Sequence, residues 1–166
     1  MKIIEQSHNV WGVCPVVPQE AIKWIERAGR TCYNSLDKIT DSSAEPFVRK
    51  LIERGHMSVL EHSSIVWYEP LHRLDESPYI KSLGIGGTWY SGSIRAFMEE
   101  YDKWEHGGGM KFFESWLKGA GEKAVFSAPG GAVRYTVEFH TNRAMTHELV
   151  RHRATAAYSQ ESQRYV

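Results

Sequence analysis

The C-terminal stretch, residues 143–166, carries the side chains of this sequence that are best suited to binding an anionic ligand. Its twenty-four residues include four arginines, two histidines and two serines. Arginine suits planar, bidentate recognition of phosphate and carboxylate groups, whereas a helix that needs only solubility would mix lysine and glutamate. The alternative interpretation is an exposed, salt-bridged helix end followed by a polar loop, because charge runs are usually solvated faces.

The first half of this stretch has the pattern of a helix. Its apolar residues recur at helical spacing: Ala144, Met145 and Leu149. Glu148 and Arg151 lie three residues apart and His147 and Arg151 four apart, so each pair would share a helix face. If the helix continued through Arg153, the side chains of Arg151 and Arg153 would point to different sides and could hold two anionic groups.

A second polar cluster occupies residues 55–62, Gly-His-Met-Ser-Val-Leu-Glu-His. Two histidines and a glutamate could suggest a metal, but no third clustered ligand follows and the histidines are not four apart, so we predict no metal site. A capped turn is a second interpretation, because Ser58 and Glu61 have the spacing of a capping box.

Three blocks of the sequence together resemble the flavin-dependent thymidylate synthases (the ThyX family). They are Ala-Gly-Arg-Thr-Cys-Tyr-Asn-Ser at 28–35, His-x-Ser-x-x-Glu-His at 56–62, and Arg151-His152-Arg153 followed by Ser-Gln-Glu-Ser-Gln-Arg-Tyr at 159–165. The family signature places seven residues between its Arg-His-Arg and a serine, with an arginine two positions further on. Here eight residues separate Arg153 from Ser162, so we expect one extra residue, most simply within 154–157.

The resemblance implies reductive methylation of deoxyuridine monophosphate (dUMP) to thymidylate (dTMP). Methylenetetrahydrofolate would give the carbon, NADPH would reduce the bound FAD, and the protein would be a homotetramer with shared active sites. By matching positions, it implies these FAD-binding residues: His56, Ser58, Glu61, Arg151, His152 and Arg153. It likewise implies these nucleotide-binding residues: Glu148, Arg151, Gln160, Glu161, Ser162, Gln163 and Arg164. No residue is assigned to catalysis itself.

Two other functions stay open at this point. Members of the family usually continue for several dozen residues past the signature, so the first alternative is a C-terminally short remnant that binds flavin or nucleotide without catalysis. The second is a small RNA- or single-strand-binding module that stacks bases on arginine and tyrosine, from this set: Arg151, Arg153, Tyr158, Arg164 and Tyr165. A formal net charge of zero argues against nucleic-acid binding, which needs a positive surplus.

Composition is that of an ordinary globular chain. The 166 residues are 42% hydrophobic and 24% charged, and we expect a single domain spanning 1–166. Cys14 and Cys32 are too few for a disulfide framework, and Cys32 lies on an apolar stripe where a packed thiol is favoured over a nucleophile. No signal peptide or membrane-spanning run is visible, which favours a cytoplasmic protein and no membrane partner.

The element pattern predicts an α+β fold in which a largely antiparallel sheet is flanked by helices. We expect a strand at 2–5, a loop at 9–18, helices at 18–33 and from Ser43 to Gly55, a strand at 63–69 and a helix at 93–104. Residues 70–131 are interpreted as a variable insertion without a catalytic role, whose aromatic residues pack in the core. The clearest strand, 133–139, alternates apolar and polar residues, and we expect its apolar face to be buried: Val133, Tyr135, Val137 and Phe139.

Overall fold

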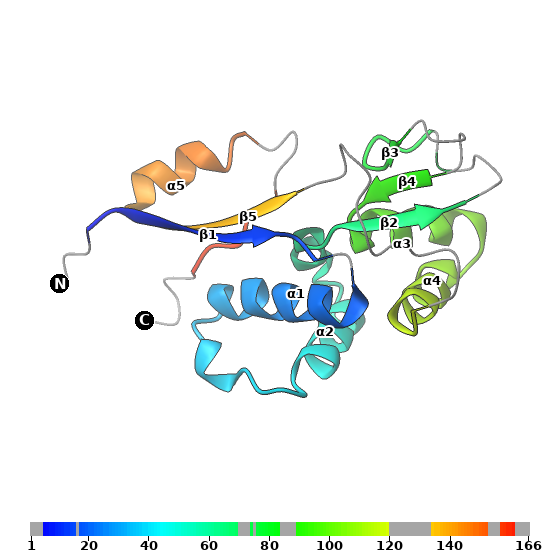
Figure 1. The fold of residues 1–166 in the computed structure, drawn as a ribbon, viewed down its shortest axis with the longest axis horizontal. Helices are drawn as coiled ribbons and strands as arrows, with labels where there is room; N and C mark the ends of the chain where they lie inside the picture. The colour runs from blue at the N-terminus through cyan, green and yellow to red at the C-terminus, as the bar shows by residue number, and fades with distance from the viewer. Residues whose placement is uncertain are drawn as a thin grey trace.

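The structure, a computed structural model, describes residues 5–15, 17–69, 74, 76–83, 89–119, 134–152 and 157–161. They form an α+β fold of helices and two antiparallel sheets (Figure 1). The predicted fold class is confirmed, and the strands divide between a two-stranded and a three-stranded sheet. No helix among the residues described is long and apolar enough to cross a membrane.

Helices α1 (Pro18–Cys32) and α2 (Ala44–Glu53) build one side of the core, as predicted. Pro18 lies in the first turn of α1, where its missing N–H costs nothing. Gly29 lets the two helices approach closely, because a Cβ there would lie 2.7 Å from the Phe47 ring. Gly55 ends α2 with φ +71°, and the Leu51 carbonyl accepts from the His56 N–H at 2.9 Å, as in a Schellman motif. A short 3₁₀ turn, η1 (Leu36–Lys38), links the two helices.

The three-stranded sheet has the order β2 (Ile65–Tyr68), β4 (Trp89–Gly92), β3 (Lys81–Ser82). Helices α3 (Ile94–Trp104) and α4 (Gly108–Leu117) follow it. Phe97 stacks on Phe112 with ring centroids 5.3 Å apart, and Trp67 of β2 meets Phe112 edge-on at 5.0 Å. Most aromatic residues described in the predicted insertion therefore belong to the core, as expected, whereas Tyr79 is exposed.

The second sheet is a ribbon of two strands far apart in the chain, β1 (Ser7–Val13) and β5 (Tyr135–His140). Figure 1 shows the ribbon between helix α1 on one side and α5 (Arg143–Leu149) on the other. The predicted loop at 9–18 is wrong for residues 9–13, which pair with β5 across a bulge between Val10 and Gly12. Of the predicted strand at 2–5, Glu5 is not in a strand, and 2–4 lie outside the residues described.

The predicted burial of β5 is also wrong, because the ribbon packs on α1 with its polar face. Trp11 meets Trp24 of α1 edge-on at 5.7 Å and donates its indole N–H to Glu138 at 2.9 Å. Tyr135, Val137 and Phe139 instead lie on the face opposite α1 and are 65%, 38% and 55% exposed. Val133 lies outside the residues described.

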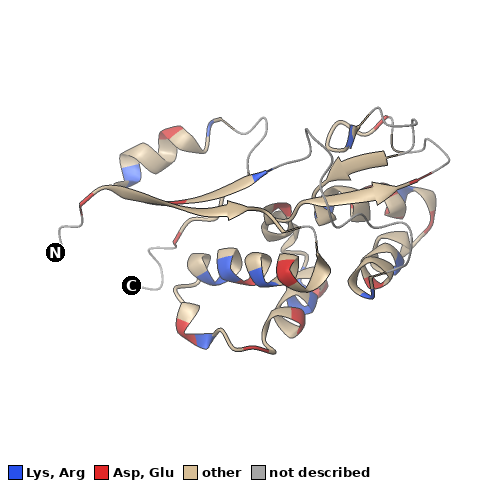
Figure 2. Ribbon diagram, viewed as in Figure 1, with Lys and Arg blue, Asp and Glu red and all other residues tan. Residues whose placement is uncertain are grey.

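Charged residues are interspersed over the surface. Figure 2 shows both basic and acidic residues on α1 and α2, and strands β1, β2 and β4 carry neither kind. The described helices therefore carry no long run of one sign of the kind that nucleic-acid binding needs.

Candidate functional site

The His-x-Ser-x-x-Glu-His block folds as a 3₁₀ turn, η2 (Met57–His62), between α2 and β2. Buried Val59 and Leu60 anchor the turn in the core, which leaves its polar side chains at the surface or at the joints with other elements. The capping-box interpretation is wrong: the turn begins after His56, and no side chain caps it. Ser58 is exposed and open to a ligand.

His56 connects the turn to the end of α1. The Tyr33 hydroxyl and His56 Nδ1 lie 3.2 Å apart, within hydrogen-bonding distance. Tyr33 belongs to the first of the three sequence blocks and His56 to the second, so the fold brings these two blocks together. Tyr33 was not predicted as a site residue, although its place in the Arg-x-Cys-Tyr run was the signal for it.

Glu61 is held by a basic residue of α3. Arg95 Nη1 donates to Glu61 Oε1 at 2.6 Å, and both side chains are about one-third exposed. Sequence reasoning missed this contact because Arg95 and Glu99 resemble an ordinary pair four residues apart on a helix.

His62 connects the turn to the C-terminal loop. Its Nε2 lies 2.9 Å from the hydroxyl of Ser159, ninety-seven residues away in the chain. Burial lowers the pKa of His62 from its usual 6.5 to about 4, although a hydrogen bond with the Tyr158 backbone partly opposes this. The imidazole is therefore neutral near pH 7. The adjacent Tyr158 donates its hydroxyl to the His152 carbonyl at 3.1 Å, so this part of the loop is also tied to the segment that follows α5.

Helix α5 leads into the basic signature, which begins at Arg151, but the helix ends at Leu149. Asn142 caps the helix by accepting from the Met145 N–H at 3.0 Å, and no residue of α5 is buried. The chain leaves the helix after Leu149, where the N–H of Arg151 bonds to the carbonyl three residues back. We predicted that Arg151 and Arg153 would point to different sides if the helix continued through Arg153. The helix does not continue that far, because Arg151 already lies beyond its end.

Glu148 and Arg151 pair with each other at the surface. Their charged groups lie 3.1 Å apart, and the side chains are 64% and 73% exposed. Within the residues described, no hydrogen bond or ion pair joins either of them to the η2 turn. Gln160 and Glu161 follow Ser159 on the loop and are exposed. Four predicted site residues lie outside the residues described: Arg153, Ser162, Gln163 and Arg164.

Cys14 is poorly suited to act as a nucleophile. Burial raises the pKa of its thiol, an effect that a hydrogen bond with Thr136 and the charge of Arg134 only partly offset. Its sulfur is buried and lies 3.2 Å from Thr136 Oγ1, at the end of the ribbon where the Cys14 N–H donates to the Arg134 carbonyl. A buried, protonated thiol is a packing group rather than a reactive one. Among the residues that the structure places, no three histidine, cysteine or carboxylate side chains gather as a metal site.

Fold and site together define an α+β protein in which a histidine–glutamate turn is linked to the first helix, to α3 and to a polar C-terminal loop. Over residues 17–70 and 94–166 the chain matches the family described as Thymidylate synthase complementing protein. The chain belongs to this family.

Its relatives are similar over a shorter stretch. Proteins named flavin-dependent thymidylate synthase from Mycolicibacterium vanbaalenii and Mycobacteroides abscessus are each 48% identical over 46 residues, which is 26% of this chain and 18% of theirs. One from a Mycobacterium species, strain JLS, is 46% identical over the same length. The aligned part thus spans less than a fifth of the curated relatives. No solved structure matches the chain significantly.

Proposed function

We propose that this chain is a protomer of a flavin-dependent thymidylate synthase, which converts dUMP to dTMP with methylenetetrahydrofolate and NADPH. The observation that carries the proposal is the contact between His62 and Ser159 at 2.9 Å, because it joins the turn to the loop that bears the second half of the signature. We assign no single catalytic residue. We assign these residues to the FAD site: His56, Ser58, Glu61, Arg151, His152 and Arg153. We assign these to the dUMP site: Glu148, Arg151, Gln160, Glu161, Ser162, Gln163 and Arg164.

The residues of the turn fit an anionic dinucleotide. His62 is neutral, His56 and Ser58 are exposed donors or acceptors, and the carboxylate of Glu61 is paired with Arg95. A turn with little uncompensated negative charge does not repel phosphate groups. Bound FAD would supply hydride, and the protein would orient the three ligands.

The surface positions of Glu148 and Arg151 support a site shared between subunits. Both face solvent and are paired only with each other among the residues described. The adjoining ribbon exposes an apolar face that includes Val10 (53% exposed), and exposed apolar patches mark interaction sites. We therefore propose a homotetramer in which α5 of one subunit faces the η2 turn of another. We also propose a cytoplasmic location, which is consistent with the family.

The test is the visible absorbance of the purified protein before and after FAD is added, with dUMP then titrated in. Flavin bands that dUMP perturbs, followed by thymidylate formation with NADPH and methylenetetrahydrofolate, are the expected result. Bound flavin without thymidylate formation would favour the non-catalytic remnant. A protein that takes up no FAD would overturn both.

Two variants make this test specific to the proposed site. Arg151→Ala should weaken FAD and dUMP binding. Lys111→Ala, on the exposed surface of α4, should leave both unchanged.

A further inference from the structure

Arg95 of α3 bridges two carboxylates with two different nitrogens. Its Nε donates to Glu99 Oε1 at 2.7 Å, and its Nη1 donates to Glu61 Oε1 at 2.6 Å. Because the nitrogens differ, both bonds form at once. Glu99, one helical turn further along α3, holds the guanidinium in one orientation and leaves its other edge for Glu61.

The start of α3 is itself tied to the end of the η2 turn. Ser63 is buried; its hydroxyl accepts from the Ile94 N–H at 2.8 Å and donates to the Leu60 carbonyl at 2.5 Å. Ser93 caps α3 by accepting from the Ala96 N–H at 3.2 Å. These bonds leave little freedom for Arg95 relative to Glu61.

We propose that Arg95 is a positioning residue of the flavin site and acts through Glu61. This inference rests on the proposed function. Arg95 holds the Glu61 carboxylate in one place and offsets its charge, so that the turn accepts the phosphates of FAD. Residues 70–131 are predicted to have no catalytic role, and Arg95, as a positioning residue, does not conflict with that prediction.

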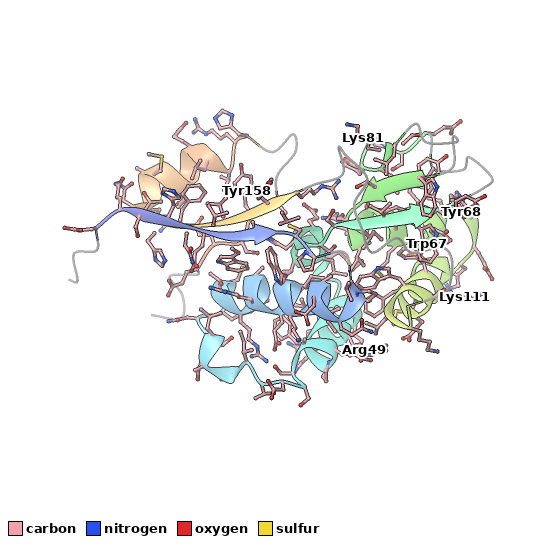
Figure 3. The ribbon with its side chains drawn as sticks, viewed as in Figure 1. Arg49, Trp67, Tyr68, Lys81, Lys111 and Tyr158 are labelled. Carbon is pink, nitrogen blue, oxygen red and sulfur yellow. The ribbon has the colours of Figure 1, made fainter. Side chains whose placement is uncertain are left out.

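Arg49 of α2 provides a matched control. It too bridges a glutamate four residues away on its own helix, Glu45 at 2.7 Å, and a glutamate of another helix, Glu114 of α4. The exposed fractions of the two arginine side chains are nearly equal, 32% for Arg49 and 34% for Arg95. Figure 3 shows Arg49 on the α2–α4 side of the molecule, well away from Tyr158 on the C-terminal loop.

The experiment compares FAD dissociation constants and urea-unfolding midpoints for four proteins: wild type, Arg95→Gln, Arg49→Gln and the double variant Glu61→Gln/Arg95→Gln. Both single variants should lose similar stability. Only Arg95→Gln should weaken FAD binding, by about three- to tenfold, because it leaves Glu61 uncompensated.

Two readouts separate positioning from a merely structural effect. The defect of Arg95→Gln should shrink at high salt, where repulsion between Glu61 and phosphate is screened. The double variant should bind FAD more tightly than Arg95→Gln, because it removes the uncompensated charge of Glu61 and keeps a side-chain amide that can still contact FAD. The inference is overturned if Arg95→Gln binds FAD like wild type, if Arg49→Gln is equally impaired, or if neither salt nor the double variant restores binding. If wild type binds no FAD, the proposed function itself fails.

Discussion

Two regions of this molecule use their apolar residues in opposite ways. The packed region, within residues 17–119, buries large aromatic side chains such as Phe97, Phe113 and Trp116 almost completely. The open region, the β1–β5 ribbon with α5, leaves its apolar side chains exposed and packs on α1 through the contacts of Trp11 with Trp24 and of Glu138 with Arg27. The first region buries its apolar residues within one chain, whereas the second leaves an apolar face exposed, which fits the subunit contact proposed above. The residues proposed for nucleotide binding lie in and after the second region.

The largest difference between the two regions should be seen when an aromatic residue of each is replaced and the loss in free energy of unfolding is compared. Phe97→Ala should lower the free energy of unfolding by about 3–5 kcal/mol, because it removes a fully buried ring that stacks on Phe112. Phe139→Ala should change it by less than about 0.5 kcal/mol at low protein concentration, where association contributes nothing. Urea unfolding measures both, and equal losses would contradict the division into two regions.

The joint between the packed region and the C-terminal loop should be sensitive to acid. The pKa of His62 in the folded protein, about 4, lies below its usual 6.5, so the unfolded chain binds more protons between these values. The contribution of neutral His62 to the free energy of unfolding is complete above pH 6.5. It is lost as the pH falls toward 4, by about 3 kcal/mol at most. His62→Gln, which keeps a hydrogen-bonding group near Ser159, should flatten that part of the pH dependence. An NMR titration in which His62 titrates near 6.5 would rule the explanation out.

Sequence reasoning succeeded where the signals are local. Pro18 at the start of α1, Gly55 after α2 and Ser93 before α3 each act within one turn of the chain, and the helices begin and end there. It failed where a distant partner decides. Strand alternation in β5 showed that its two faces differ, but only contacts with α1 show which face is covered: Trp24 meets Trp11, and Arg27 pairs with Glu138, 111 residues away.

The candidate site shows the same limit. The residues of the η2 turn could be identified from the sequence because they are contiguous. The resemblance assigned FAD-binding residues to both this block and the C-terminal block, but the contact between His62 and Ser159 was not predicted. The pairing of Glu61 with Arg95 could not be predicted from the sequence, because Glu99, four residues further along the helix, is already a suitable partner for Arg95. The end of α5 was missed because no glycine or proline marks it; only bonds three residues back, such as that of Arg151, show it.

A charge on the apolar face of the ribbon should interfere with assembly. Phe139→Lys should weaken self-association at least about tenfold, because interface centres tolerate charge poorly. Tyr79→Lys is the matched control, since Tyr79 is an exposed aromatic residue outside the ribbon. Sedimentation equilibrium gives the mass of each variant. If both variants assemble like wild type, the apolar face is not the contact between subunits.

The smallest effect should come from the helix caps. Ser93 caps α3 in the packed region and Asn142 caps α5 in the open region, at 3.2 and 3.0 Å. Ser93→Ala should lower the free energy of unfolding by about 1 kcal/mol, because α3 unfolds only with the core. Asn142→Ala should barely change it, because α5 buries no residue, yet amide exchange within α5 should accelerate. Global destabilisation by Asn142→Ala would mean that α5 belongs to the cooperative unit of the packed region even within one protomer.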